Sequence, residues 1–309
     1  IPPAVPAVSF SVLPGGIDTH VHYDLSISEA MSAQSAEAGS RAGIWGGTTT
    51  YIDFSMASGE ESLVGSIEGK LEQTQAQNPH SDYAMHAILA GDWPLRSADE
   101  IADAISGGVV SFKFFTAFKG SPTIGGMQSD DGRIYSAMLE TERHGGIVMV
   151  HCEDECIIDY NVRKLYAQGR PEFWNIGEAR PPLAEEAAVR RMLLLSKRTG
   201  SPLYIVHVSA KESVEAITDA RRDGVDVFAE TLHPNLVFDP SLYKQEQGQR
   251  YMNYPPNIDS VLYPMAEWNK TSAAVRRLNR FDPDNVEFIG RFLNGPTPVA
   301  LAAPARLPI

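Results

Sequence analysis

Two histidines near the start of the chain have a spacing that suits metal binding. His20 and His22 follow the turn-prone, apolar segment PGGIDT at residues 14–19. If this segment belongs to a β-strand, the two-residue period of the strand directs both imidazoles to the same side. Two neutral imidazoles placed in this way can bind one divalent cation. The spacing therefore predicts one half of a metal site.

Polar residues also end three other strongly apolar runs. Lys113 follows the run at 110–112, His151 follows the run at 147–150, and His207 follows the run at 204–206. A polar side chain at the end of a buried strand costs free energy unless it has a partner. One metal site shared by four strand ends is a simpler explanation than four separate exceptions. Asp53 and His86 stand at comparable positions, and we interpret His86 as structural.

Lys113 requires a chemical explanation of its own, because an ammonium group cannot ligate a metal ion. Burial beside other cations would lower the pKa of this lysine and favour its neutral amine. A neutral amine can react with carbon dioxide to give a carbamate, which offers a carboxylate-like group to two metal ions at once. Two bridged ions would lower the pKa of a shared water and supply hydroxide at neutral pH.

The elements that would position these residues alternate along the chain. The predicted strands cover residues 12–17, 48–54, 83–89, 109–115, 147–150, 203–206 and 225–229, and the predicted helices lie near 29–44, 60–76, 97–106, 133–144, 184–199 and 211–223. This alternation is typical of βα units in an α/β protein. Seven units favour a (β/α)₈ TIM-like barrel, whose site lies at the carboxyl ends of the strands. An open doubly wound sheet is the alternative, but no dinucleotide or P-loop fingerprint favours it.

The alternation of predicted strands and helices stops after residue 256, and no eighth apolar strand follows. We expect the barrel to occupy residues 12–296, with its eighth-strand region incomplete, and residues 1–11 and 297–309 to be remnants of terminal segments.

The composition of the chain limits the classes of partner that it could bind. A net charge of −13 argues against nucleic acid and anionic membranes, and no apolar run is long enough to span a bilayer. With only Cys152 and Cys156, a disulfide framework is not expected, which favours the cytoplasm.

Eight segments, in order from residue 14 to residue 256, resemble the hydantoinases and dihydropyrimidinases, the cyclic-amidohydrolase branch of the amidohydrolase superfamily. They are PGGIDTHVH (14–22), GGTTTYIDF (46–54), SFKFFTAFKG (111–120), VMVHCED (148–154), ARPPLAEEAA (179–188), LYIVHVSA (203–210), AET (229–231) and YPP (254–256). The resemblance implies a metal-dependent barrel, usually accompanied by a small β-sandwich from the chain termini. It also implies a homo-oligomer, typically a tetramer.

The resemblance implies a role for each strand-end residue. His20 and His22 would hold the first metal ion, His151 and His207 the second, and carboxylated Lys113 would bridge them. Zinc is the usual ion of the family, and cobalt or manganese can serve. The implied reaction is hydrolysis of a C–N bond in a small cyclic amide or ureide, of hydantoin or dihydropyrimidine type, by a hydroxide shared between the ions.

Three departures from the family pattern bear on function. The family's Asp-His pair after the eighth strand is absent, so the catalytic aspartate is unassigned, and we expect residues 256–296 to be a shortened stretch. Asp282 and Asp284 fit a solvated turn better than that role. The family tyrosine that donates to the oxyanion is replaced by Phe118, and one such donor is worth roughly 3–4 kcal/mol. Tyr254, in the position of a substrate-contacting serine, is a candidate replacement for that donor.

Two alternatives therefore stay open beside the cyclic substrate. The same chemistry could act on a non-ring amide, carbamate or thiocarbamate, because the Phe118 position lacks a hydroxyl. A non-catalytic dihydropyrimidinase-like scaffold protein is the second alternative, which the missing aspartate favours and the five retained ligands oppose. His233, near the end of the seventh predicted strand, is a further candidate for substrate contact.

Overall fold

Seven strands form one parallel sheet, in the order β1-β4-β5-β6-β7-β8-β9. The structure is a computed structural model that describes residues 14–28, 31–32, 34–57, 61–93, 97–119, 126–232, 234–238, 240–251 and 253–256. The strands are β1 Gly16–Asp18, β4 Thr48–Ala57, β5 Asp82–Leu89, β6 Ser111–Phe115, β7 Ile147–His151, β8 Leu203–Ile205 and β9 Val227–Ala229. All seven lie within or beside the predicted runs. The expected eighth-strand region, beyond residue 256, lies outside the described residues.

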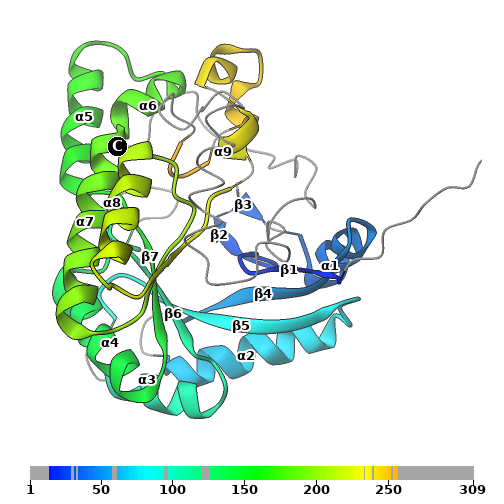
Figure 1. Cartoon of the computed structure of the whole chain (residues 1–309). Helices are drawn as coiled ribbons and strands as arrows, with labels where there is room; N and C mark the ends of the chain where they lie inside the picture. Colours follow the sequence, from blue (N-terminus) through cyan, green and yellow to red (C-terminus); the bar gives the residue numbers. More distant parts are fainter. Residues whose placement is uncertain are drawn as a thin grey trace, which may run out of the picture.

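Helices connect successive strands and cover the outer side of the sheet (Figure 1). They are α1 Ala36–Trp45, α2 Leu63–Ala76, α3 Ser97–Ser106, α4 Asp131–His144, α5 Glu155–Ala167, α6 Ile176–Ala179, α7 Pro182–Thr199 and α8 Lys211–Arg222. A further short helix, α9 Pro234–Val237, follows β9. Short 3₁₀ turns occur at Phe173–Asn175, Pro240–Lys244 and Gly248–Tyr251. Strands alternating with helices around a curved parallel sheet confirm the predicted α/β barrel-type architecture.

Local capping chemistry sets the helix boundaries, and it explains one error in the sequence-based expectation. The predicted helix at 29–44 starts too early. Within that range, β3 Met31–Ser32 pairs antiparallel with β2 Ser26–Ser28, and the observed helix α1 follows β3. The helix begins only after Ser35, whose side chain accepts a hydrogen bond from the amide of Ala38. Helix α5 was not predicted, and it begins after Asp154, whose carboxylate caps the amide of Ile157.

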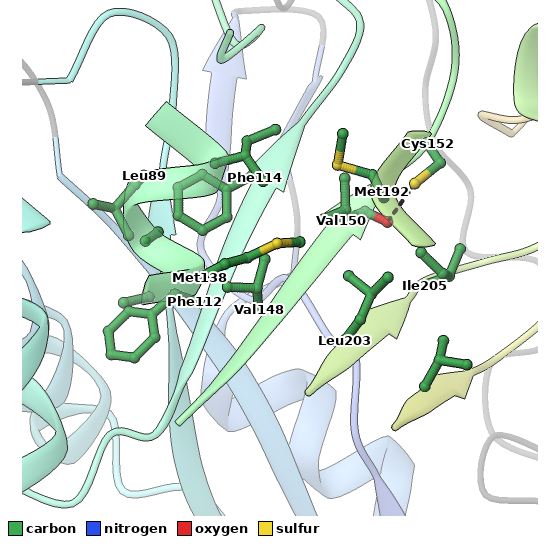
Figure 2. Packing of buried hydrophobic residues seen from close by; sticks show 14 of the residues in the cluster. Leu89, Phe112, Phe114, Met138, Val148, Val150, Cys152, Met192, Leu203 and Ile205 are labelled. Atoms are coloured by element: carbon green, nitrogen blue, oxygen red, sulfur yellow. Dashed lines mark hydrogen bonds between the residues drawn. The ribbon is translucent and has the colours of Figure 1, made fainter. Parts of the chain in front are cut away.

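The two-residue period of the strands sorts their side chains into two layers. Phe112 and Phe114 of β6, with Val148 and Val150 of β7, pack against the helices in a large apolar cluster (Figure 2). The intervening positions face the other way, so that the side chain of Lys113 lies on the concave side of the sheet. Strand geometry therefore directs a charged residue into the barrel interior without disturbing the apolar layer outside.

The sheet is strongly curled, and this brings its two edges together. Strands β1 and β9 are six strand intervals apart in the sheet order. In a flat sheet that separation would be about 29 Å, since neighbouring strands lie about 4.8 Å apart. His20, just after β1, is nevertheless hydrogen-bonded to Glu230, just after β9. The curl is what allows residues from the first and last strands to share one site.

Candidate metal centre

The first pair of predicted ligands lies just beyond the carboxyl end of β1. The Nε2 atoms of His20 and His22 are 3.2 Å apart. The ring of Phe54, from β4, stacks on His22 at a centroid distance of 4.6 Å and contacts His20 at 4.9 Å. Burial, with the nearby His20 and Lys113 charges, lowers the pKa of His22 well below its ordinary value. The His22 ring is therefore neutral at physiological pH, with a lone pair available.

The second pair lies at the ends of β7 and β8. Nδ1 of His151 and Nε2 of His207 are 3.1 Å apart, and both side chains are buried. Burial lowers the pKa of His151 to about 4 and that of His207 well below its ordinary range. The ring centroids of His207 and His20 are 5.8 Å apart. The two pairs predicted from the sequence are thus brought into one cluster.

Lys113, the predicted bridge, lies between rings that border the two pairs. Its Nζ is 5.9 Å from the ring centre of Phe54, which contacts the first pair, and 5.2 Å from that of Phe115. Phe115 in turn contacts His151 at a ring-centroid distance of 5.7 Å. The lysine side chain is 1% exposed, and burial lowers its pKa to about 7. A substantial share of the amine is therefore neutral near physiological pH.

Two carboxylates, the buried Glu153 and the partly buried Glu230, select which imidazole nitrogen faces the centre. Glu230 hydrogen-bonds to Nδ1 of His20, which leaves Nε2 of that ring directed at His22. Glu153 lies 2.7 Å from Nε2 of His151, which leaves Nδ1 directed at His207. A carboxylate on the distal nitrogen is the usual way in which proteins orient a metal-binding histidine.

Neither carboxylate was assigned a role from the sequence, although a signal was present. Glu230 directly follows the last predicted strand, and Glu153 stands two residues after His151. The strand-end rule that selected the histidines would also have selected Glu230. Burial opposes its ionisation, but the facing His20 ring and the hydroxyl of Tyr204 outweigh burial and lower the pKa of Glu230 to about 2.

The nitrogen positions can be tested against the requirements of a divalent ion. In the described part of the chain, no three His, Cys, Asp or Glu side chains converge on one point as a ready-made site. The imidazoles instead form two pairs, with nitrogens 3.1 and 3.2 Å apart. Two nitrogens bound to one tetrahedral zinc ion at about 2.0–2.1 Å would be about 3.4 Å apart. Each pair therefore fits two ligands of one ion, with further ligands needed from elsewhere.

Other residues noted in the sequence lie beside the centre or outside the described residues. His86 places Nε2 3.0 Å from the carbonyl oxygen of Thr19 and hydrogen-bonds through Nδ1 to Ser111. Asp53 instead pairs with Lys70 of α2, with an Oδ2–Nζ distance of 3.1 Å. His233, Asp282 and Asp284 lie outside the residues that the structure describes.

Of the two candidate substrate-binding residues, Phe118 contacts the second histidine pair and Tyr254 packs on Phe118. The ring of Phe118 contacts His151 at a centroid distance of 4.7 Å, and Tyr254 meets Phe118 edge-to-face at 5.5 Å. Phe118 has a left-handed backbone with φ of 74°, and its amide donates to Glu155 Oε2 at 2.7 Å. A fixed aromatic wall thus borders the site where the family pattern places a donor hydroxyl.

Comparison with known proteins points in the same direction as the geometry. Residues 11–176 match the amidohydrolase family. The chain is 37% identical over 227 residues to a D-hydantoinase of Streptomyces coelicolor, covering 74% of this chain and 47% of that protein. It is 32% identical over 235 residues to the dihydropyrimidinase of Rattus norvegicus, covering 75% of this chain and 44% of the relative.

A solved structure agrees with these sequence matches. The D-hydantoinase from Bacillus sp. AR9 superposes with a TM-score of 0.75 at 32% identity, covering 84% of this chain and 55% of the other. The chain therefore spans about half the length of the curated relatives that it matches. The region that matches the amidohydrolase family, residues 11–176, includes His20, His22, Lys113 and His151.

Proposed function

Because the chain belongs to the amidohydrolase family, in its hydantoinase- and dihydropyrimidinase-like branch, we propose that it contributes the metal centre of a hydrolase. The proposed reaction is cleavage of a C–N bond, other than a peptide bond, in a small cyclic amide or ureide. The observation that carries this proposal is the clustering of two imidazole pairs, with the buried Lys113 amine beside the phenyl rings that contact each pair.

The proposed cofactor is two divalent ions, with zinc as the first choice and cobalt or manganese as substitutes. His20 and His22 would hold one ion, His151 and His207 the other, and carboxylated Lys113 would bridge them. When bound, such ions lower the pKa of water and polarise a carbonyl oxygen. The neutral rings of His22, His151 and His207 suit this role, because a protonated imidazole cannot bind a metal ion.

The chain's own side chains would supply orientation and a dry environment. Phe54 and Phe115 lie beside the Lys113 amine, and the lysine is buried from solvent. Phe118 and Tyr254 form a wall against which a planar substrate ring can lie. The hydroxyl of Tyr254 is the proposed donor to the carbonyl oxygen as charge develops there. The group that takes the proton is unassigned.

Metal analysis together with a substrate panel tests this proposal. The purified chain is expected to bind about two divalent ions and to turn over at least one of hydantoin, dihydrouracil or a carbamate. Preference for the carbamate would favour the non-ring alternative, for which the phenyl ring at position 118 is the specific argument. No bound metal, or no turnover of any member of the panel, would contradict the proposal.

The stoichiometry of the second histidine pair can be tested by substitution. His207→Asn is expected to reduce the metal content from about two ions per chain to about one, because the second pair loses one of its two nitrogens. The measurement is elemental analysis after gel filtration. His144→Asn, on the surface of α4, is the control and should keep both ions. Retention of two ions in His207→Asn would remove His207 from the ligand set.

The pH dependence of Lys113 carboxylation follows from its lowered pKa. Only the neutral amine reacts with carbon dioxide, and a pKa of about 7 raises the neutral fraction from about one tenth at pH 6 to about nine tenths at pH 8. At fixed dissolved carbon dioxide, metal-free protein should therefore gain carboxylated Lys113 faster as pH rises through 7. Intact-mass analysis after trapping with zinc measures the gain. A rate that is flat between pH 6 and pH 8 would contradict the assignment.

We also propose that the chain acts in the cytoplasm and assembles as a homotetramer. Cys152 and Cys156 are both free, Cys152 buried and Cys156 exposed, which is compatible with a reducing cytoplasm. Among the described residues, no helix has the length and apolar character to cross a membrane. A homotetramer is proposed from the family resemblance, and sedimentation of the purified chain would test it.

A further inference from the structure

The segment ARPPLAEEAA at residues 179–188 resembles the family pattern, and it contains none of the proposed metal ligands or wall residues. Its arginine, Arg180, lies between α6 and α7, and its side chain is only 8% exposed. A guanidinium group is always charged, so its burial requires compensating partners. The structure shows two kinds of partner, a carboxylate and two aromatic rings.

The edge of Arg180 connects it to the second histidine pair. Its Nη1 pairs with Oε2 of Glu153, the same oxygen that lies 2.7 Å from Nε2 of His151. Arg180 and His151 thus meet at one carboxylate oxygen of Glu153. This oxygen accepts from the His151 Nε2–H, and Nδ1 stays directed at His207.

The guanidinium group of Arg180 also contacts the aromatic wall. The guanidinium carbon lies 4.8 Å from the ring centre of Phe118 and 4.5 Å from that of Tyr254. Both distances fall within the range of cation–π contact. Phe118 follows β6, and Tyr254 lies beyond the last described strand. One planar side chain therefore joins two segments that are far apart in the sequence.

We propose that Arg180 is a positioning residue that couples the orientation of His151 to the placement of the substrate wall formed by Phe118 and Tyr254. This inference rests on the proposed function and assigns the wall's geometry to a single side chain. The ion pair with Glu153 serves the metal side, and the contacts of the guanidinium group with the two rings serve the substrate side. The two roles can be separated, because lysine keeps the charge but lacks the plane.

Two substitutions, made in the full chain, separate the roles. Arg180→Lys should keep both metal ions, because the ammonium can still pair with Glu153, while KM rises about tenfold and kcat stays within about threefold. Arg180→Met removes the charge as well, and the affinity of one metal ion should fall about 10- to 100-fold. Chelator competition measures metal retention, and steady-state kinetics on the best panel substrate measure the KM-against-kcat split.

Two matched variants test whether the effects of the Arg180 substitutions arise only from loss of folding. Arg191→Lys, on α7, alters another partly buried arginine that pairs with Asp131 and Asp154 and touches neither ring; it should match wild type in both readouts. The double variant Arg180→Met with Glu153→Gln leaves no buried carboxylate without its cation. It should fold and still lose metal more readily than wild type.

The outcomes distinguish this inference from the function on which it rests. If wild type binds two ions while Arg180→Lys keeps the wild-type KM and the double variant keeps wild-type metal affinity, the coupling role is overturned and the proposed function stands. If wild type binds no metal, the proposed function fails, and the positioning role fails with it. A rise in KM for Arg180→Lys together with early metal loss in the double variant supports the inference.

Discussion

Replacing Lys113 by alanine is expected to remove the bound metal and to lower kcat by about a thousandfold or more. The lysine would supply the side-chain group that bridges the two ions, and the ions contribute several kcal/mol to the reaction. The buried amine lies beside Phe54 and Phe115, and a methyl group at position 113 cannot form the carbamate. Elemental analysis and turnover of the best panel substrate measure the two effects.

Lys119→Ala is the matched control, because Lys119 is exposed in the same segment after β6. It should keep metal and activity. The Lys113 variant also separates the enzyme from the non-catalytic scaffold. An enzyme loses metal and turnover on this substitution, whereas a scaffold keeps its assembly and has no turnover to lose. A Lys113→Ala chain that retained two ions would rule out the bridging role.

Tyr254→Phe is expected to lower kcat on a cyclic ureide by about 10²- to 10³-fold, with little change in KM. The substitution removes only the hydroxyl that we propose as the oxyanion donor, and loss of one such donor typically has an effect of this size. The phenyl ring would keep its contacts with Phe118 and Arg180, so the wall should stay in place. Steady-state kinetics with hydantoin or dihydrouracil provide the measurement.

The hydroxyl can also be moved within the wall. The double variant Phe118→Tyr with Tyr254→Phe returns a hydroxyl to the position where the family has it, and it should recover part of the lost kcat. Tyr160→Phe is the control, because Tyr160 is 66% exposed on α5, and it should behave like wild type. An unchanged kcat in Tyr254→Phe would show that the donor is another group.

The strands and most helices could be predicted from the sequence because their signals are local. The apolar runs before His151 and His207 end within one residue of the ends of β7 and β8. Gly145 ends α4 in the left-handed conformation that glycine favours. The β2–β3 hairpin was missed because a two- or three-residue strand has too few residues to display a period. The curl of the sheet depends on contacts between distant residues, such as His20 with Glu230, and no local pattern reports them.

The metal site shows the same difference between local sequence signals and contacts of distant residues. The ligand types were identifiable because each ends an apolar run, and the structure brings His20, His22, His151 and His207 together. Their orientation was not identifiable, because it depends on partners from other segments. Glu153 binds the far nitrogen of His151, and Arg180, 27 residues further on, holds Glu153. Such three-residue arrangements arise only when the fold is complete.

Anomalous diffraction from crystals of the metal-loaded chain is the most direct test of the proposed binuclear centre. We predict two metal peaks, one contacting His20 Nε2 and His22 Nε2 and the other contacting His151 Nδ1 and His207 Nε2. Additional density should extend from Nζ of Lys113 to both peaks. A single peak, or two peaks beside an unmodified Lys113 after loading in the presence of bicarbonate, would contradict the account.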